Sequence, residues 1–350
     1  MNPESNLSTQ YSDESVSQNS THDFRPDVGS ESTRIILPII IIGENGFRRI
    51  IDLRKRNRRF KTLTATAESL WDDNVERLEN KIFFNPTLRK ILVNNVVNFV
   101  QKCELNGIEI YSQYLAENNA VAFDKQNFVL LLKALREKFD KRGLILALAV
   151  DAYESTADKY DIKEVSKYIS FINLRAYHFH GDSDVKQRAK AGHIAPLHPS
   201  SQENTEEQKL NVDYIMKHWL SQGTPPYKLI LGTTFNGISY TLANVNIVGR
   251  DAPVVVNPKY YLPTISYYYT CLREKNHVWT HLWEKEQRVP YISKMEKMIA
   301  YENVASIKLK AQYAKRMRLG GVFADSIDGD DFSGYCGVEP FTLLKAMSRA

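Results

Sequence analysis

Two kinds of segment alternate along most of this chain, and this alternation constrains the fold more than any other feature. From residue 35 onward, short runs of β-branched and apolar residues are separated by longer segments in which apolar residues recur at helical spacing. This order predicts parallel strands joined by crossover helices. The expected strands are Ile35–Ile42, Phe60–Ala67, Gly107–Tyr111, Leu144–Val150, Ile169–Tyr177, Lys228–Thr234 and Gly321–Ile327.

Local signals mark the ends of the expected helices. Asn85 followed by Pro86 predicts the start of one helix, because asparagine caps helix N-termini and proline suits the first helical position. A later helix is expected from about residue 306 to 318. Gly320 and Gly321 are expected to end it as a C-cap.

Two segments that depart from the alternation define the expected domains. Residues 1–34 are rich in Ser, Asp, Glu, Asn and Thr with almost no aliphatic side chain to bury, which predicts a disordered polar tail. Residues 237–300 are rich in Tyr, Val and Pro, which predicts a small α+β insertion domain on one βα loop. Repeated βα units with one insertion favour a TIM-type (β/α)8 barrel of residues 35–236 and 301–350. The alternative is an open doubly wound sheet, although no Gly-rich phosphate loop follows any expected strand.

Charge, cysteine spacing and apolar runs exclude several classes of function. The 46 Lys and Arg residues exceed the 41 Asp and Glu residues by only five and are spread along the expected helices, so nucleic-acid binding is not expected. Cys103, Cys271 and Cys336 lack the spacing of a zinc site, and neither a metal nor a cofactor is expected. The longest apolar run contains Pro38 and is far shorter than the roughly 18 residues that a membrane span needs. The chain as given shows no secretory signal near Met1.

The third expected strand carries the clearest candidate site residues. A TIM barrel places its functional side chains at the C-terminal ends of its strands. The alternation of side chains along this strand points Glu109, Tyr111 and Gln113 into the barrel. The stretch Asn106-Gly107-Ile108-Glu109-Ile110-Tyr111-Ser112-Gln113 resembles the Asp-Gly-x-Asp-x-Asp-x-Glu motif of glycoside hydrolase family 18.

The resemblance extends from Phe47 to the C-terminus, and this segment resembles a chitinase-like protein of that family. Matching stretches in the expected order include Phe179-His180-Gly181, Gly192–Leu197, Leu229–Gly232 and Asp328–Gly334. The family cleaves β-1,4-linked N-acetylglucosamine polymers, using the last Glu of the motif as the general acid and the acetamido oxygen of the substrate as the nucleophile. That Glu falls at Gln113, whose carboxamide has no titratable proton, so the resemblance implies a catalytically inactive protein.

Other family positions are changed as well. The Asp that orients the acetamido group falls at Tyr111, and the outer Asp falls at Glu109. The family's Met-x-Tyr-Asp reads Arg175-Ala176-Tyr177-His178, and the Trp that forms the floor of the sugar subsite falls at Asp325. The Tyr-Gly-Arg after the seventh strand begins at Asn236.

These changes predict a degenerate central cleft. Arg175 and Asp325 are expected to pair across it, and any remaining sugar affinity is expected from surface aromatics such as Trp71 or Trp283. The alternative to a binding role is that Tyr111 and Gln113 are polar and aromatic residues that fill the mouth of a barrel without a substrate. His178, His180 and His193 match no metal-ligand spacing.

The resemblance gives two hypotheses for function. The first is an inactive chitinase-like protein of the imaginal disc growth factor type, which binds chitin or chito-oligosaccharide weakly, or a cell-surface protein, outside the cell. The alternative is a residual hydrolase that uses a non-standard acid such as Glu109, although Glu109 lies about 13 Å along the strand from Gln113.

The resemblance also implies one disulfide and one departure from the family. Cys271 and Cys336 match the pair that joins the insertion to the C-terminal segment. The family's first strand and helix have no clear counterpart, and Ile35–Ile42 is expected at or near the second strand. Because Pro38 removes one ladder donor, the barrel is expected to lack a regular first strand and to be open between its second and eighth strands.

Overall fold

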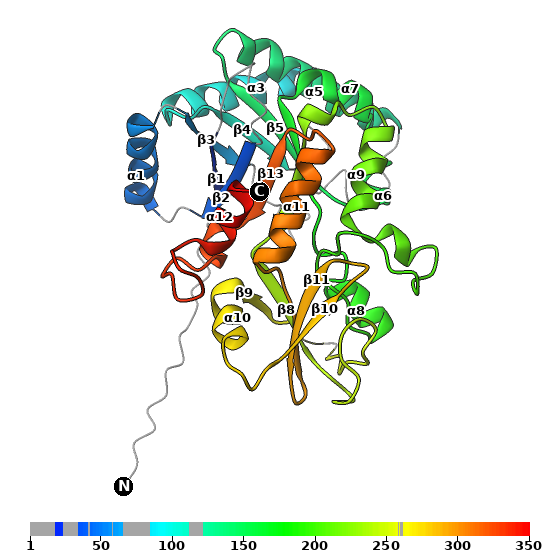
Figure 1. Ribbon diagram of the computed structural model, residues 1–350. Helices are drawn as coiled ribbons and strands as arrows, with labels where there is room; N and C mark the ends of the chain where they lie inside the picture. Colours follow the sequence, from blue (N-terminus) through cyan, green and yellow to red (C-terminus); the bar gives the residue numbers. More distant parts are fainter. Residues whose placement is uncertain are drawn as a thin grey trace.

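Eight strands form a closed barrel, which confirms the predicted TIM-type fold (Figure 1). The computed structural model describes residues 18–23, 34–40, 43–57, 59–65, 85–111, 122–257, 259 and 262–350. The order around the barrel is β1-β2-β13-β7-β6-β5-β4-β3, and β1 pairs with β3 to close it. The barrel strands are β1 (Gln18–Asp23), β2 (Arg34–Ile40), β3 (Phe60–Ala65), β4 (Gly107–Tyr111), β5 (Ile145–Asp151), β6 (Phe171–Arg175), β7 (Leu229–Thr234) and β13 (Gly321–Asp325).

Helices surround the barrel and connect its parallel strands (Figure 1). They are α1 (Gly43–Arg56), α3 (Pro86–Lys102), α5 (Ala122–Asp140), α6 (Glu154–Ala157), α7 (Ile162–Tyr168), α9 (Val212–Ser221), α11 (Val304–Arg316) and α12 (Thr342–Ser348), with 3₁₀ helices η1 (Glu207–Lys209), η2 (Pro226–Lys228) and η3 (Ile327–Gly329). The short helix α8 (Asp182–Arg188) lies beside the second sheet, which residues 236–300 form (Figure 1). No helix in the described ranges is long and apolar enough to cross a membrane.

The expectation that residues 1–34 form a disordered tail is wrong for residues 18–23. These residues form β1, which runs antiparallel to both β2 and β3, while the other strand pairs of the barrel are parallel. The composition argument failed because a strand can be held by backbone hydrogen bonds on both edges, which need no aliphatic side chains. The rest of the predicted tail lies outside the described residues, apart from Arg34 in β2.

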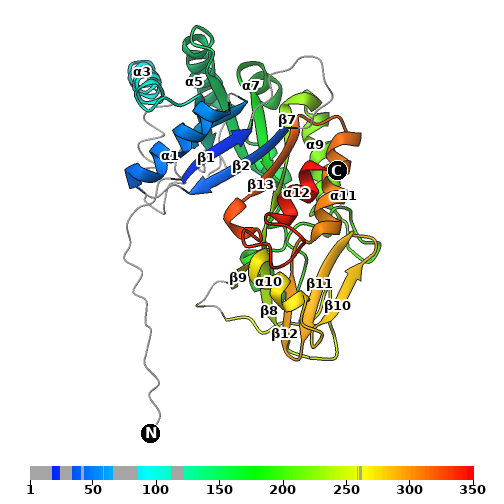
Figure 2. The ribbon, with the colours of Figure 1, turned by 60° about the vertical axis from the view of Figure 1, so that its left-hand side comes forward.

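The expectation of an open barrel is also wrong. β2 lies directly beside β13, with Arg34 opposite Gly321 and Ile36 opposite Phe323. This ladder ends before Pro38, so it does not need the hydrogen-bond donor that proline lacks. Pro38 lies opposite Ser20 in β1, the antiparallel strand between β2 and β3 in the barrel order. Figure 2 shows β1 and β2 side by side.

Residues 236–300 build a second, antiparallel sheet below the barrel (Figures 1 and 2). Its order is β10-β11-β12-β8-β9. The elements are β8 (Asn236–Thr241), β9 (Thr264–Ser266), α10 (Tyr267–Glu274), β10 (Thr280–Glu284), β11 (Val289–Lys294) and β12 (Lys297–Ala300). One buried cluster joins Leu63 and Phe323 of the barrel to Tyr240 and Tyr291 of this sheet, so the two sheets share a core.

The two predicted helix boundaries have different outcomes. The start at Asn85 is confirmed: its side chain accepts hydrogen bonds from the backbone of Thr87 and Leu88, and Pro86 is the first helical residue. The C-cap predicted at Gly320 is wrong, because α11 ends at Arg316. Gly320 instead permits a close approach: a Cβ atom there would lie 2.2 Å from the carbonyl oxygen of Tyr227.

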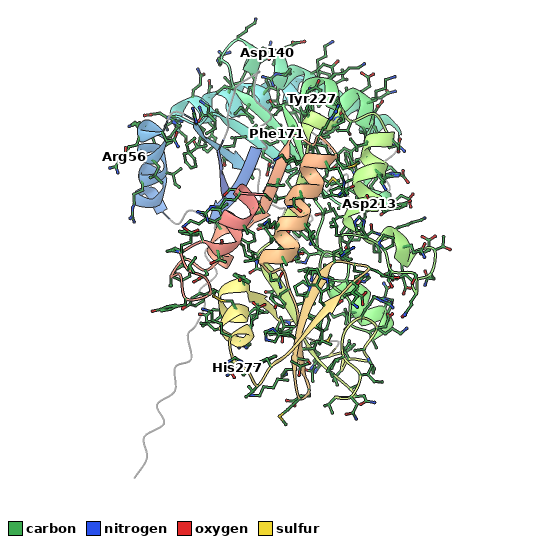
Figure 3. The ribbon with its side chains drawn as sticks, viewed as in Figure 1. Arg56, Asp140, Phe171, Asp213, Tyr227 and His277 are labelled. Atoms are coloured by element: carbon green, nitrogen blue, oxygen red, sulfur yellow. A yellow bond between two sulfur atoms is a disulfide. The ribbon has the colours of Figure 1, made fainter. Side chains whose placement is uncertain are left out.

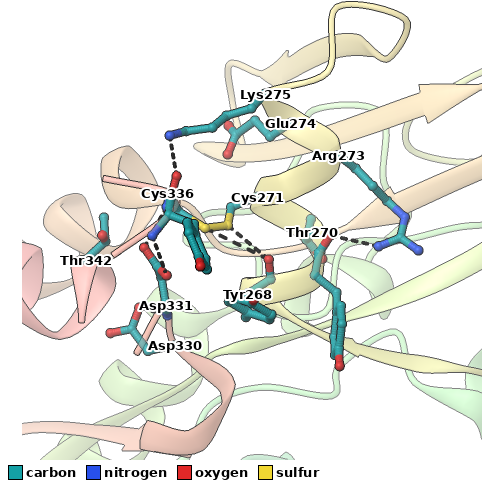
Figure 4. Close-up of a disulfide and its surroundings, with 12 residues drawn as sticks. Tyr268, Thr270, Cys271, Arg273, Glu274, Lys275, Asp330, Asp331, Cys336 and Thr342 are labelled. Carbon is teal, nitrogen blue, oxygen red and sulfur yellow. Dashed lines mark hydrogen bonds between the residues drawn. A yellow bond between two sulfur atoms is a disulfide. The ribbon is translucent and has the colours of Figure 1, made fainter. Parts of the chain in front are cut away.

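The predicted disulfide is confirmed (Figure 4). Cys271 on α10 is bonded to Cys336 in the loop before α12, and their Cα atoms are 5.6 Å apart. Cys103, at the C-terminal end of α3, is a free thiol. The disulfide therefore fixes the C-terminal loop to α10 of the second sheet region.

Candidate functional site

Four charged or phenolic side chains meet at one end of the barrel because each is the last residue of its strand. Tyr111 ends β4, Asp151 ends β5, Arg175 ends β6 and Asp325 ends β13. Asp151 lies opposite Arg175 in the ladder between β5 and β6. The C-terminal ends of parallel barrel strands share one rim, so these side chains converge where the functional site of such a barrel lies.

Arg175 is the centre of this group. Its guanidinium carbon lies 5.0 Å from the ring centroid of Tyr111 and 5.6 Å from that of Tyr177. Its Nε donates to the hydroxyl of Tyr177 at 2.9 Å and lies 3.7 Å from Asp151 Oδ1, while Nη2 lies 3.8 Å from Asp325 Oδ2. The predicted ion pair between Arg175 and Asp325 is therefore confirmed.

The two tyrosines connect the carboxylates to this centre. Tyr111 donates its hydroxyl to Asp151 Oδ2 at 2.9 Å, and Tyr177 donates to Asp325 Oδ2 at 2.7 Å. Burial raises the pKa of Tyr177 well above its usual value, so this hydroxyl keeps its proton. Arg175 with Tyr111, Asp151, Tyr177 and Asp325 thus forms one connected set, called the arginine cluster below.

Asp151 is the member that the sequence analysis missed. It follows directly after the predicted apolar strand Leu144–Val150, and this position was the available signal. From the sequence alone, a carboxylate at the end of a strand cannot be distinguished from an ordinary loop residue. Only the register of β5 against β6 places Asp151 opposite Arg175.

Glu109 lies deeper in the barrel than the arginine cluster. It points to the same side of β4 as Tyr111 but two residues earlier, and it is 5% exposed. Asn173 Nδ2 donates to Glu109 Oε2. Burial raises the pKa of the Glu109 carboxyl to about 7, although the Asn173 hydrogen bond and the charge of Arg175 act in the opposite direction.

Two further predicted site residues lie at the edge of the cluster. His178 has a left-handed backbone conformation (φ 65°), and its ring contacts the ring of Tyr177 edge-on at 5.1 Å. Its carbonyl oxygen accepts a hydrogen bond from Tyr153 at 2.8 Å. Asn236 begins β8, and its backbone N–H donates at 3.0 Å to the hydroxyl of Thr234. That hydroxyl donates to the carbonyl oxygen of Asp325 at 2.8 Å, which links Asn236 to the edge of the cluster.

Gln113 and Trp71 lie outside the described residues, so their predicted roles stay predictions. Trp283 is part of β10, where it lies opposite Pro290 of β11. It is partly exposed and belongs to the second sheet instead of the barrel end.

The three histidines considered for a metal site are not gathered into one. His180 Nδ1 lies 2.9 Å from Arg188 Nη2. His193 is buried, with Nε2 2.6 Å from the carbonyl oxygen of Tyr301 and Nδ1 accepting from the backbone of Ala195 at 3.0 Å. Within the described part of the chain, no three His, Cys, Asp or Glu residues could hold a metal ion together.

A separate cavity of about 580 Å³ lies beside α9 on the outer wall of the barrel. Its polar residues pair largely with one another. Lys217 lies 2.8 Å from Asp213, and Glu154 accepts from both Lys209 and Tyr214 at 2.9 Å. The arginine cluster remains the stronger candidate site, because it lies at the C-terminal ends of the barrel strands, whereas this cavity lies on the outer wall.

Comparison with known proteins gives a consistent set of matches. The model of the family described as glycosyl hydrolases family 18 matches residues 8–330. "Probable chitinase 10" of Drosophila melanogaster is 29% identical over 317 residues, which cover 87% of this chain and 13% of that protein. "Probable chitinase 2" of the same species is 28% identical over 318 residues, which cover 86% of this chain and 62% of that protein. The chain thus spans less than two thirds of these two relatives.

Solved structures agree with these sequence matches. The Group IV chitinase of Ostrinia furnacalis in complex with allosamidin superposes with a TM-score of 0.78 at 29% identity, covering 87% of this chain and 83% of that one. Human YKL-39, described as a pseudo-chitinase with retained chitooligosaccharide binding properties, superposes with a TM-score of 0.77 at 25% identity, covering 90% and 87%.

Proposed function

Because this chain belongs to family 18 of the glycosyl hydrolases, as its motifs predicted, we propose that it is a catalytically inactive chitinase-like protein that acts by binding carbohydrate. The observation that carries the proposal is the position of Arg175. Its guanidinium group lies at the end of the barrel between two tyrosine rings and two carboxylates. A sugar ring at this place would have to displace a charged group that already has its partners.

The cost of that displacement supports a closed central pocket. Moving Arg175 would leave Asp151 and Asp325 as partly buried carboxylates without their cation, and it would remove both ring contacts. Breaking such an arrangement costs more than the arrangement itself contributes, because the remaining charges stay desolvated. An uncharged sugar offers no replacement for the positive charge.

The residue at the acid position gives independent support. The family's general acid falls at Gln113, which has no proton to donate. General acid–base catalysis typically contributes about a hundred- to ten-thousandfold in rate. The acetamido-orienting Asp is replaced by Tyr111, whose hydroxyl is already donated to Asp151.

One observation favours the alternative, a residual hydrolase with Glu109 as its acid. A carboxyl with a pKa of about 7 is well suited to donate a proton near neutral pH. Glu109 is buried below the arginine cluster, however, and its carboxylate accepts from Asn173. A glycosidic oxygen at the barrel mouth could reach it only if the cluster opened.

The test is hydrolysis of a fluorogenic chito-oligosaccharide, with an active chitinase as the positive control. We expect no turnover from the wild-type protein or from Gln113→Glu, because Arg175 with its partners already occupies the end of the barrel and Tyr111 stands at the position of the acetamido-orienting Asp. Turnover by the wild type that disappears in Glu109→Gln would establish the alternative. Clear turnover by Gln113→Glu alone would refute the closed pocket.

Binding and location complete the proposal. Retained chitooligosaccharide binding in a pseudo-chitinase relative supports weak binding of chitin fragments here, and a cell-surface protein is a second possible class of partner. The disulfide supports an extracellular location, since disulfides persist in oxidising compartments. Detection of the protein in the medium of producing cells, as opposed to the cell lysate, tests the location.

A further inference from the structure

Four aromatic side chains form an exposed surface beside the barrel end. Tyr268 contacts the other three rings: it stacks on Phe332 with 5.0 Å between ring centroids, meets Tyr269 edge-on at 5.2 Å, and lies 6.5 Å from Tyr335. Tyr269, Phe332 and Tyr335 are 58%, 54% and 63% exposed. These four residues are called the rim platform below.

The rim platform is held rigid from both sides. Two of its residues belong to α10 and two to the loop before α12, and the Cys271–Cys336 disulfide joins these segments (Figure 4). The carboxylate of Asp331 accepts hydrogen bonds from the backbone of Tyr335 at 3.0 Å and of Cys336 at 2.7 Å. Lys275 Nζ donates to the carbonyl oxygen of Tyr335. A rigid surface loses little conformational entropy when a ligand binds.

Backbone hydrogen bonds place the platform on the rim of the barrel mouth. Phe235, directly after β7, donates to the carbonyl oxygen of Asp325 at 2.9 Å, and the first residue of α10, Tyr267, donates to the carbonyl oxygen of Phe235 at 2.8 Å. The platform loop follows β13 and η3 along the chain. The platform loop thus emerges from the C-terminal end of β13, and these hydrogen bonds place the start of α10 at the same end of the barrel, where the arginine cluster lies.

We propose that the rim platform binds a β-1,4-linked pyranose chain, whose flat C–H faces stack on the exposed rings. This inference rests on the proposed carbohydrate-binding function and assigns that function to a surface outside the closed central pocket. The tyrosine hydroxyls of the platform can hydrogen-bond to sugar hydroxyls, as amphipathic aromatic side chains do at other recognition surfaces.

The size of the platform favours a sugar chain over a protein. Its three exposed rings present on the order of 350 Å². A stable protein interface needs about 800 Å² from each partner. Sugar rings, in contrast, are matched to single aromatic side chains, so a few rings are enough for a short oligosaccharide.

The experiment measures affinity by isothermal titration calorimetry with chitohexaose and, separately, cellohexaose. These two probes share the β-1,4-linked pyranose backbone and differ in the acetamido group, so they separate a chitin ligand from a cellulose-like one. We expect Phe332→Ala and Tyr335→Ala each to weaken binding about two- to tenfold, because each removes one stacking surface. Phe332→Tyr should restore the affinity, since it keeps a ring at that position.

Tyr227→Ala is the matched control. Tyr227 is 62% exposed, similar to Tyr335, and it lies in η2, before β7. Figure 3 shows Tyr227 at the end of the molecule opposite His277, which follows α10. Its removal should leave both affinities unchanged, and thermal unfolding of each variant checks that the fold is intact.

The outcomes separate this proposal from the proposed function. If the wild-type protein binds a hexasaccharide and the folded platform variants keep full affinity, the platform assignment is refuted while carbohydrate binding stands. If the wild type binds neither hexasaccharide, the carbohydrate-binding function fails and the platform assignment fails with it. Loss of affinity in Tyr227→Ala equal to that in Tyr335→Ala would also refute the assignment.

Discussion

Replacing Glu109 by glutamine is expected to stabilise the protein at neutral and alkaline pH but not at acidic pH. Glu109 is buried in the barrel, and burial raises the pKa of its carboxyl from the usual 4.5 to about 7. At roughly 1.4 kcal/mol per pH unit, this difference corresponds to a destabilisation of about 3 kcal/mol by the ionised group. Glutamine has nearly the same shape and carries no charge.

The sign of the pH dependence follows from proton binding. Because the pKa is higher in the folded than in the unfolded state, the folded protein binds more protons between pH 4.5 and about 7. The contribution of Glu109 to the free energy of unfolding therefore falls as pH rises through this window, and it levels off above it. The glutamine variant lacks this contribution, so the difference between the two proteins should grow by about 3 kcal/mol from pH 4.5 to pH 8.

The surroundings of Glu109 can accept the amide. Asn173 donates to Glu109 through Nδ2, while Asn173 Oδ1 is buried without a hydrogen-bond partner among the described residues. The amide nitrogen of a glutamine at position 109 could donate to this oxygen. The substitution thus replaces the protonated carboxyl by a group that can make the same hydrogen bonds and fills the same volume.

Urea unfolding followed by circular dichroism at pH 4.5, 6 and 8 measures this difference. At pH 8 the expected gain corresponds to a rise of about 4 °C in Tm for a chain of this size. Glu137→Gln, on the exposed face of α5, is the matched control and should show no comparable dependence on pH. A constant difference between wild type and Glu109→Gln across the three pH values would refute the argument.

Two other substitutions test the covalent and ionic links of the fold. Cys271→Ser combined with Cys336→Ser should cost about 4 kcal/mol on the chain-entropy estimate for a separation of 65 residues, and an unchanged Tm in the absence of reductant would contradict it. Lys310 and Glu302 form a buried pair in which Lys310 also donates to the carbonyl oxygen of Ala195 at 2.6 Å. Lys310→Met should cost about 3–5 kcal/mol in urea unfolding, because it leaves the Glu302 carboxylate buried and unpaired. Lys310→Met with Glu302→Leu should recover most of this loss, and equal losses in the single and double variants would exclude the mechanism.

Features that depend on neighbouring residues were predictable from the sequence. The alternation of strand and helix patterns identified the barrel, and Asn85 with Pro86 marked the start of α3. The family motifs placed Tyr111, Arg175 and Asp325 in one cleft, and the pairing of the last two was expected from their opposite charges. The family motifs supplied the disulfide, which no local pattern would have revealed.

Features that depend on pairing between distant segments were decided only by the tertiary structure. The place of residues 18–23 between β2 and β3, and the contact of β2 with β13, are set by backbone ladders, which carry no side-chain signature. Asp151 joins the arginine cluster because the register of β5 and β6 places it opposite Arg175. Local patterns determine which segments form strands and which of their faces are buried. The register of the strands and the closure of the barrel depend instead on the simultaneous pairing of all strands. That pairing decides which charged side chains meet at the end of the barrel.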